Sequence, residues 1–579
     1  MEKIYLRDHG ILPGNDCTLA LVNLFNTYKE DTEFIFDEGK YYFTHKIFKD
    51  IPLSNTDVIP ERVLGVLLEN MKNIRLTGNN TWLMYEGMMQ AVTMLHCENI
   101  VMDGFTIDWE KPLISEGVIV GKDENTIDIY INPEVFPHRI REGQIEFDLG
   151  ADQWVGIGVT WECAIEFDFN NRAIRKNTGD SVYLISLNED LGNNVYRFNY
   201  NNSDVKIGNI LAIRHNFRRH AGIFTEKCKN ITIENVNVHS CNGLGCLAQF
   251  CEDLTYRKVN FIPNRKAGRE VVNGRDDGMH ITCCKGTVTI TECSFVGLMD
   301  DPINVHGCCV NGVEWVDEYT VICKFVHDQA CGFAYWAEDG DEIVFINRKN
   351  MSPLGTAISC KYTLIDKTTF EVKFTEPVSD EIRGINTEDI ALDNLTHTAS
   401  FVCSKNRFGS CRARGVLVST PKPVKIINNV FQSSGSAILV AGDSNYWYES
   451  GECHDVEISG NMFYDSCLSS YYGFCEGIIS VCPVVPEPEI DKPFHKNIRI
   501  HDNTFDTPDT PLLYSLSCDG LEFKNNRIFK SPSTDKWHPG THFFNLNYCK
   551  NVEINNNDFI GVFNLEMIKS ENCKNVKVN

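Results

Sequence analysis

Residues 273–307 read NGRDDGMHITCCKGTVTITECSFVGLMDDPINVHG and contain two carboxylate pairs, Asp276/Asp277 and Asp300/Asp301. Asp277 and Asp300 are 23 residues apart, and a histidine follows each pair. Between the pairs, residues 287–291 alternate polar and apolar side chains, which is typical of a β-strand. If 23 residues form one turn of a solenoid, the two pairs lie on neighbouring turns of one face.

The same spacing recurs along the chain. Its unit is an Asn-like residue followed by alternating hydrophobic positions. Copies begin at Asn73, Asn99, Asn230, Asp253, Asp455, Asn497, Gly520, Asn551 and Asn575. Adjoining copies are 23 or 24 residues apart, enough for three short strands and their turns. This pattern predicts an all-β parallel β-helix, with apolar residues inside and asparagines in turns that need left-handed backbone or side-chain hydrogen bonds.

Two stretches without the Asn signature divide the chain. We expect them to be small, related, barrel-like β modules inserted into loops of the solenoid, because solenoids accept insertions on one face. Residues 16–28 predict a helix capped by Asp16 or Thr18 that covers the open end of the solenoid. The expected parts are 1–109 (cap and first coils), 110–214 (module 1), 215–308 (coils with the Asp cluster), 309–398 (module 2) and 399–579 (C-terminal coils).

The composition limits the partners of this protein. A formal charge of −25 argues against nucleic acid, because phosphate binding needs a basic surface. No apolar run is long enough to span a membrane, and MEKIYLRDHGILPGN contains no signal sequence, so we expect a cytoplasmic protein. The 24 cysteines form no CxxC pairs and many occupy strand positions. They are therefore expected to be reduced core residues.

The carboxylate pairs suggest acid/base chemistry. Strands of neighbouring turns lie about 4.8 Å apart, so stacked carboxylates repel and the pKa of at least one rises. A protonated carboxyl beside an ionised one can hydrolyse a glycosidic bond. The alternative is that Asp–Asp pairs are solvated turn residues. Asp300 and Asp301 point to opposite faces of a regular strand and reach one site only at a bend, with which Pro302 is compatible.

Other residues could bind a sugar, and each has a structural alternative. The two histidines are sugar donors or buried stacking residues, and the two arginines are surface residues or clamps for hydroxyl or carboxylate groups. The aromatic loop 445–451 either packs on a pyranose or anchors itself in the core. These candidates are His280, His306, Arg412, Arg414, Trp447 and Glu449. No zinc motif, nucleophile elbow or P-loop occurs, so no metal and no cofactor are expected.

Several motifs together resemble glycoside hydrolase family 110, from about Met71 to the C-terminus. They are DGMH (277–280), LMDDPINVHG (298–307), RARGVLVSTP (412–421), GDSNYWYESG (442–451), IDWE (107–110), and Arg214-His215 with GIF (222–224). The resemblance implies a right-handed parallel β-helix with inserted β-barrels that removes terminal α-1,3-galactose with inversion, from linear or blood-group-B-type glycans. It implies Asp300 as general acid and Asp277 with Asp301 as holders of water. It adds Asn304, Arg214 and His215 to the sugar-binding residues.

Two rival functions remain open on the sequence. A β-helix polysaccharide lyase would need a basic residue near the acids and often Ca²⁺, and a non-catalytic solenoid would bind glycans without cutting them. The expected partner is an α-galactoside oligosaccharide or glycan, and the protein could also form a homo-oligomer.

Overall fold

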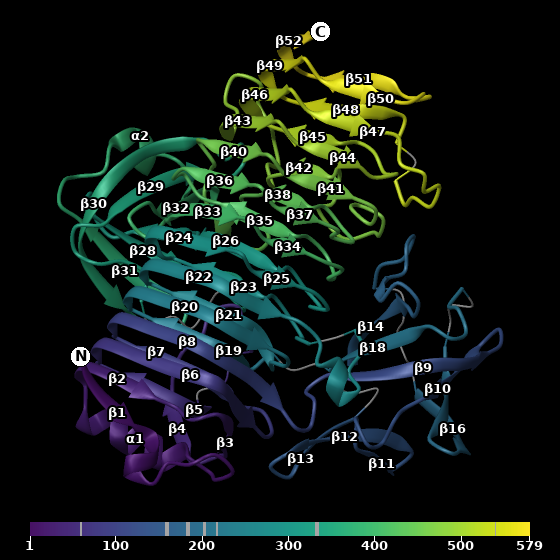
Figure 1. Ribbon diagram of the computed structural model, residues 1–579. Helices are drawn as coiled ribbons and strands as arrows, with labels where there is room; N and C mark the ends of the chain where they lie inside the picture. Colours follow the sequence, from purple (N-terminus) through teal and green to yellow (C-terminus); the bar gives the residue numbers. More distant parts are fainter. Residues whose placement is uncertain are drawn as a thin grey trace.

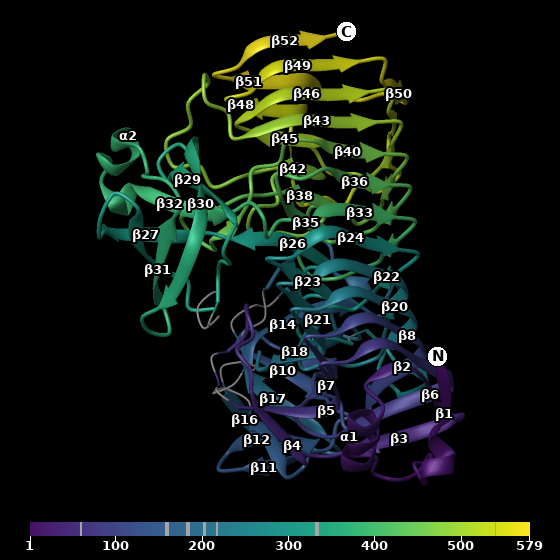
Figure 2. The same ribbon diagram turned by 90° about the vertical axis from the view of Figure 1, so that its left-hand side faces the viewer.

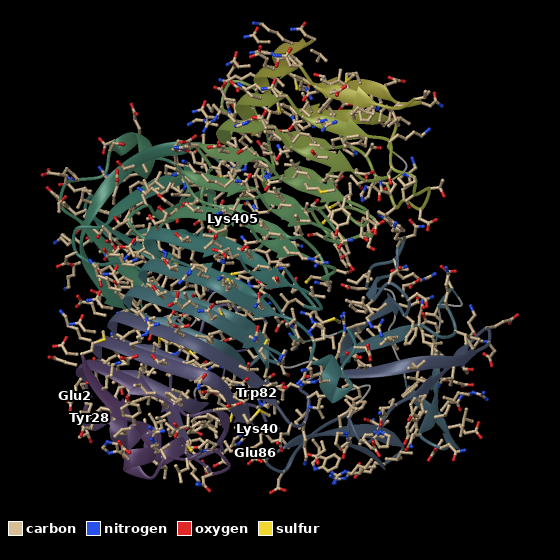
Figure 3. The ribbon with its side chains drawn as sticks, viewed as in Figure 1. Glu2, Tyr28, Lys40, Trp82, Glu86 and Lys405 are labelled. Atoms are coloured by element: carbon tan, nitrogen blue, oxygen red, sulfur yellow. The ribbon has the colours of Figure 1, made fainter. Side chains whose placement is uncertain are left out.

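The protein is a long stack of β-coils from which two β modules project (Figures 1 and 2). The computed structural model describes all residues except 58, 60, 157–160, 181–185, 201–203, 216–217, 272, 330–334 and 539, and the side chains of 161–163 and 215. Charged side chains such as Glu2, Lys40, Glu86 and Lys405 lie on the outside (Figure 3). The expected parallel β-helix with two inserted β modules is confirmed.

The coils have three faces, each a ladder of parallel strands. The first face contains β2 (Glu30–Ile35), β6 (Lys72–Tyr85), β8 (Glu98–Trp109), β20 (Lys229–Val238), β22 (Glu252–Phe261), β24 (Lys285–Thr291), β33 (Ser400–Ser404), β36 (Val424–Ile427), β40 (Val456–Ser459), β43 (His495–His501), β46 (Cys518–Lys524), β49 (Lys550–Asn555) and β52 (Lys574–Val578), with β1 (Glu2–Tyr5) beside β2. The second contains β3 (Gly39–Phe43), the ends of β6, β8, β20 and β22, then β25 (Ser294–Phe295), β34 (Arg407–Phe408), β37 (Val430–Phe431), β41 (Met462–Tyr464), β44 (Thr504–Asp506), β47 (Arg527–Phe529) and β50 (Asp558–Ile560).

The third face carries the candidate site. Its strands are β5 (Glu61–Glu69), β7 (Gln90–Leu95), β19 (His220–Glu226), β21 (Gly243–Gln249), β23 (Met279–Thr282), β26 (Ile303–Cys308), β35 (Val416–Ser419), β38 (Ile438–Val440), β42 (Ile479–Val481), β45 (Leu513–Leu516), β48 (His542–Asn547) and β51 (Glu566–Glu571), with β4 (Ile47–Asp50) antiparallel to β5.

Identical side chains stack from coil to coil inside the helix. Phenylalanine rings lie nearly parallel, for example Phe408 on Phe431 with centroids 4.5 Å apart. A buried amide ladder runs alongside, in which Asn461 Nδ2 donates to Asn503 Oδ1 at 3.0 Å and to the Ile426 carbonyl at 2.8 Å. Other asparagines, such as Asn99 and Asn230, have positive φ. The structural role expected for the recurring asparagines is therefore confirmed.

The N-terminal helix α1 (Thr18–Thr27) packs against the first coils, with Phe25 and Phe34 rings 4.7 Å apart. It is shorter than the predicted 16–28, and its N-cap residue Cys17 makes no side-chain cap. Asp16 Oδ1 accepts the Thr18 N–H at 3.0 Å instead, from one residue further out.

Module 1 follows β8. It consists of a seven-stranded sheet and a three-stranded one. Its strands are β9 (Ser115–Lys122), β10 (Thr126–Tyr130), β11 (His138–Arg141), β12 (Gln144–Gly150), β13 (Gln153–Gly156), β14 (Trp161–Asp168), β15 (Ala173–Ile174), β16 (Ser186–Gly192), β17 (Val195–Asn199) and β18 (Ile210–His215). Strand β8 pairs directly with β20, so the coil stack continues past the insertion.

Module 2 is a closed six-stranded barrel that follows β26. It contains β27 (Val310–Trp315), β28 (Thr320–Lys324), β29 (Glu342–Asn347), β30 (Pro353–Leu364), β31 (Thr369–Phe374), the short helix α2 (Asp380–Arg383) and β32 (Ile390–Asn394). Here β24 pairs directly with β33 and β26 with β35, so this insertion also leaves the ladder unbroken. The two modules flank the stack in Figure 1, and in the view turned by 90° both project from the same side of it (Figure 2).

The 22 cysteines that the structure describes are all free, and 19 of them are buried. Most fill inward positions of the coils, as expected for small apolar residues. No helix among the described residues is long and apolar enough to cross a bilayer.

Candidate active site

The register of the third face brings the acidic residues together. Met279 of β23 pairs with Ile303 of β26, and the Gly278 N–H donates to the Asp301 carbonyl at 2.9 Å. Asp277 and Asp301 therefore occupy the same position on consecutive coils, just before their strands begin. Asp300 and Asp301 lie in the irregular segment before β26, which is the bend that both side chains need to reach one site.

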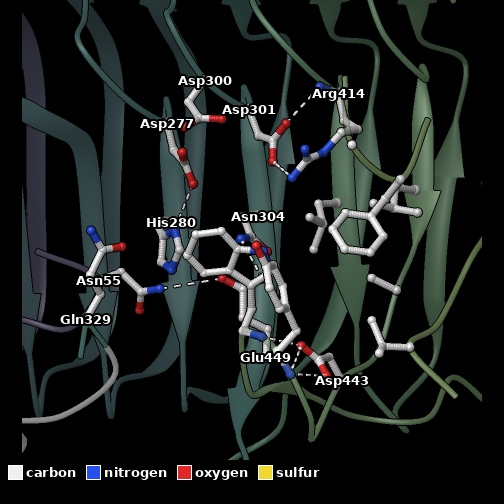
Figure 4. A pocket seen from close by; sticks show the side chains of 18 of the residues that line it. Asn55, Asp277, His280, Asp300, Asp301, Asn304, Gln329, Arg414, Asp443 and Glu449 are labelled. Carbon is white, nitrogen blue, oxygen red and sulfur yellow. Dashed lines mark hydrogen bonds and ion pairs between the residues drawn. The ribbon is translucent and has the colours of Figure 1, made fainter. Parts of the chain in front are cut away.

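These carboxylates line a cavity of about 360 Å³. Figure 4 shows Asp277 next to Asp300, His280 beneath Asp277, and Asp301 facing Arg414. The cavity is lined by Asn55, Arg214, Arg218, Asp277, His280, Asp300, Asp301, Asn304, Gln329, Arg412, Arg414, Leu417, Leu439, Ala441, Gly442, Asp443, Tyr446, Trp447, Glu449, Gly473, Phe474, Cys482 and Val484. Acids, bases and aromatic rings in one pocket suit a polar ligand with apolar faces, such as a sugar.

Asp276, beside the catalytic candidates, is buried behind the cavity with 0% of its surface exposed. It accepts from Arg214 Nη2 at 2.7 Å and from Arg275 Nη1 at 2.5 Å, and Arg218 Nε lies 3.6 Å away. Burial acts to raise the pKa of Asp276, but the three guanidinium groups outweigh it and hold the pKa well below its usual value. Asp276 thus fixes the arginines that face Asp277 and Asp300.

The three cavity carboxyls differ in their surroundings. Burial acts to raise the pKa of Asp300, yet Arg412 and Arg214, 3.1 and 3.4 Å from its oxygens, bring that pKa below its usual value. Burial raises the pKa of Asp301 to about 8, against the pull of Arg414, whose backbone N–H and guanidinium both donate to it. Burial and then Asp300 raise the pKa of Asp277 well above its ordinary value.

A chain of three hydrogen bonds leads away from Asp277. Its Oδ2 lies 2.7 Å from His280 Nδ1, and His280 Nε2 lies 2.8 Å from His306 Nε2. His306 Nδ1 must donate to the Gly307 carbonyl at 2.5 Å, because a carbonyl only accepts.

These three bonds need three hydrogens, and two neutral imidazoles supply two. The complete chain therefore holds one further proton. Burial and then Asp300 raise the pKa of Asp277, whereas burial and then His306 lower the pKa of His280, and these directions place the proton on Asp277 rather than on His280.

Glu449 and the aromatic loop form the opposite wall. Glu449, on β39 (Glu449–Ser450), accepts from Asn304 Nδ2 at 3.1 Å, and its other oxygen lies 3.7 Å from His306 Nε2. Asp443 organises residues 445–448, because its carboxylate accepts their four successive backbone N–H groups, including that of Trp447. This arrangement holds the Trp447 ring at the cavity.

Three side chains near the cavity, His280, His306 and Glu449, have atoms that could coordinate a metal ion. Ring nitrogens of His280 and His306 and an oxygen of Glu449 lie within 4.8 Å of one another. The two nitrogens are already hydrogen-bonded to each other, so a metal ion would have to displace the proton between them.

Both modules contribute to the walls. Asp180 of module 1 binds Arg412 through Nε at 2.7 Å and through Nη2. In module 2, the His327 ring lies 4.6 Å from that of Trp447, and Gln329 lines the cavity. The pocket is therefore assembled from the coils and from both insertions.

Most of the predicted site residues meet in this pocket. Those that line it are Asp277, Asp300, Asp301, His280, Asn304, Arg412, Arg414, Trp447, Glu449 and Arg214. His306 lies one residue behind, bonded to His280, and the side chain of His215 lies outside the described residues. The sequence interpretation missed Arg218, Asp443, Asn55, Gln329 and Asp180. Only Asp443 had a signal, an Asx-type residue opening the GDSNYWYESG segment.

Comparison with known proteins gives two family models and several relatives. GLAA-B beta-barrel domain I matches residues 115–211, and GLAA-B beta-barrel domain II matches residues 320–385. The chain is 36% identical to alpha-1,3-galactosidase B of Bacteroides thetaiotaomicron over 93% of this chain and 88% of that protein. It is 30% identical to alpha-1,3-galactosidase A of Bacteroides fragilis over 99% of this chain and 95% of that protein.

Similar solved structures are more distant. The Family 28 exopolygalacturonase of Yersinia enterocolitica aligns with 100% of this chain and 78% of its own, at 10% identity and a TM-score of 0.45.

Proposed function

The chain belongs to the family of the alpha-1,3-galactosidases, and we propose that it hydrolyses terminal α-1,3-linked galactose from oligosaccharides or glycans with inversion, as a glycoside hydrolase of family 110. The observation that carries the proposal is the convergence of Asp277, Asp300 and Asp301 from consecutive coils on one cavity. The aromatic loop and the arginines around the acids supply a stacking face and hydroxyl donors for a sugar.

The proposed reaction is a single displacement. Asp277 and Asp301 lie in register on neighbouring coils and so can hold one water between them, while Asp300 is offset from both. Water would attack the anomeric carbon as Asp300 protonates the leaving oxygen. The water's proton passes to the Asp277/Asp301 pair, and the released galactose carries the β configuration.

The proton that Asp300 needs is held by the neighbouring carboxyls before the galactoside binds. Arg412 and Arg214 keep the pKa of Asp300 low, whereas burial raises the pKa of Asp301 to about 8. Interacting carboxyls titrate as one unit. In this mechanism a proton therefore moves from the Asp277/Asp301 pair to Asp300 when the galactoside binds.

Leaving-group dependence tests this division of roles. An acid variant retains turnover of a dinitrophenyl α-galactoside, whose leaving group needs no protonation, and loses turnover of a disaccharide by roughly 10²–10⁴-fold. Asp300→Asn should behave in this way, and Asp277→Asn should lose both activities. If Asp301→Asn instead shows the selective loss, the acid is Asp301, the carboxyl of raised pKa.

The reaction class is tested by product analysis. NMR of the first-formed sugar should give β-galactose from an α-linked substrate. An unsaturated product with sensitivity to EDTA would indicate a lyase, and binding without galactose release would indicate a glycan-binding solenoid.

A further inference from the structure

A second cavity adjoins the first on the side of Asp300. Its volume is about 400 Å³, and it shares Arg412 and Gly473 with the cavity that holds the acids. It is lined by Arg175, Asn177, Thr178, Gly179, Asp180, Asp204, Arg412, Tyr471, Tyr472, Gly473 and Trp537. We call this space the aromatic groove.

Two aromatic rings lie open to solvent at this groove. Tyr471 is 56% exposed and Trp537 is 37% exposed, and their ring centroids are 5.4 Å apart. Large apolar rings kept exposed beside a polar cavity are typical of a binding surface, and flat aromatic faces pack on the C–H faces of pyranose rings.

Module 1 fixes the groove to the β-helix. The Asn177 N–H donates to the Ser469 carbonyl at 2.8 Å, and the Tyr471 N–H donates to the Thr178 carbonyl at 3.2 Å. Lys176 Nζ lies 2.9 Å from Asp465. These contacts hold the loop that carries Tyr471 in place. Binding a saccharide would therefore cost less conformational entropy than if the loop had to be ordered first.

Arg412 connects the groove to the acid. Its guanidinium lies over the Tyr472 ring at 5.4 Å from the centroid, while Nη1 lies 3.1 Å from Asp300. A general acid protonates the oxygen that joins the galactose to the leaving sugar, so the leaving sugar must lie on the acid's side.

We propose that the aromatic groove binds the saccharide from which galactose is removed, with Tyr471 and Trp537 stacking on its second and later sugar rings. This inference rests on the proposed galactosidase function and deepens it. It predicts that the protein prefers galactosylated oligosaccharides over small α-galactosides.

The junction at Gly473 provides a steric test. A Cβ added there meets no heavy atom within 4 Å, and its backbone has no positive φ. Gly473→Leu should therefore fold and narrow the passage between the two cavities.

The experiment compares kcat/KM for an aryl α-galactoside and for a linear tetrasaccharide ending in α-1,3-galactose. Tyr471→Ala and Trp537→Ala should each lower the tetrasaccharide-to-aryl ratio by roughly three- to tenfold, the loss expected for one stacking face. Gly473→Leu should lower it further. Phe48→Ala, which removes an exposed ring on β4 far from the groove in sequence, is the control and should leave the ratio unchanged.

An unchanged ratio in both aromatic variants would overturn the proposal, as would a drop produced by His327→Ala alone, which would place the leaving saccharide at module 2. Calorimetric titration of the tetrasaccharide into Asp300→Asn separates this inference from the reaction. If Trp537→Ala weakens this binding, the groove is supported, and if the wild-type protein nevertheless releases no galactose from the tetrasaccharide, only the proposed function fails.

Discussion

His280 Nε2 lies 2.8 Å from His306 Nε2, and this contact ties the protonation of Asp277 to a residue outside the cavity. The hydrogen-bonded series Asp277–His280–His306–Gly307 has three short contacts and needs three hydrogens. If it loses one proton, only two hydrogens remain, and at one contact two lone pairs face each other. The chain therefore resists deprotonation, in agreement with the raised pKa of Asp277.

His306→Phe removes one contact from this chain. His280 can then donate Nδ1–H to an ionised Asp277, so the pair should ionise more readily, and the acid limb of kcat/KM should move to lower pH by about one unit. The measurement is a pH–rate profile. His495→Phe, at another fully buried histidine that donates no contact to the cavity acids, should lower stability alone. If the pH–rate profile of His306→Phe is as unshifted as that of His495→Phe, His306 only packs in the core and does not influence the pKa of Asp277.

Asp276→Asn should be strongly destabilising, because it leaves buried Arg214 and Arg275 without their common carboxylate. Breaking a buried ion pair costs about 3 kcal/mol, and loss of activity should follow because Arg214 also contacts Asp300. Urea unfolding measures the free energy, with the exposed Asp317→Asn as control. Wild-type stability in Asp276→Asn would contradict the ion-pair account.

Asp443→Ala should loosen the aromatic loop by releasing four backbone N–H groups. Because Trp447 then loses its fixed position, KM for α-galactosides should rise about tenfold with a smaller change in kcat. Asp366→Ala, which breaks a similar turn in module 2, is the matched control. An equal effect of both variants would mean general destabilisation.

Asn461→Ala should interrupt the amide ladder, leaving Asn503 Oδ1 and the Ile426 carbonyl without one donor each. The expected loss of unfolding free energy is about 2 kcal/mol or more. Chemical denaturation checks it against Asn188→Ala, which removes an exposed amide at a position without positive φ. Equal losses would show that burial of the ladder adds nothing.

Asp393 links stability to pH. Burial raises its pKa from 3.8 to about 6, while Ser450 Oγ donates to it at 2.7 Å. A raised folded pKa gives stability that is present below pH 4 and lost as pH rises through 6. Asp393→Asn removes this loss, so its Tm relative to wild type should increase between pH 4 and pH 8. A constant difference in Tm would contradict the shift.

The periodicity of the sequence predicts the β-helix because each coil repeats one inward pattern. The spacing of 23 residues puts both acid pairs on neighbouring coils but pairs Asp277 with Asp300. The strands pair Met279 with Ile303, so the register here is one residue longer and Asp277 lies opposite Asp301. The predicted helix 16–28 is longer than the observed Thr18–Thr27, because Asp16 accepts the Thr18 N–H from a position outside the helix.

The walls of the pocket could not be predicted in this way. Asp180 and Gln329 come from modules without the repeat, and only the folded chain brings them beside Arg412 and Trp447. The role of Asp276 could not be predicted either. Arg214 and Arg218 are far from it in sequence and reach it only in the folded chain, and nothing in the sequence shows that its neighbour Arg275 bonds to it. The local sequence pattern predicts the β-helix and the position of the acids on it. The residues that surround the acids are determined by long-range packing and could not be predicted.

Because β8 pairs with β20 and β24 with β33, the strand pairing of the coil stack does not pass through either module. Sequence change in the modules can therefore accumulate without disturbing the spacing of the acids. A lineage built on this plan can acquire new glycan preferences by altering its two appendages, while the bond-breaking apparatus is inherited unchanged.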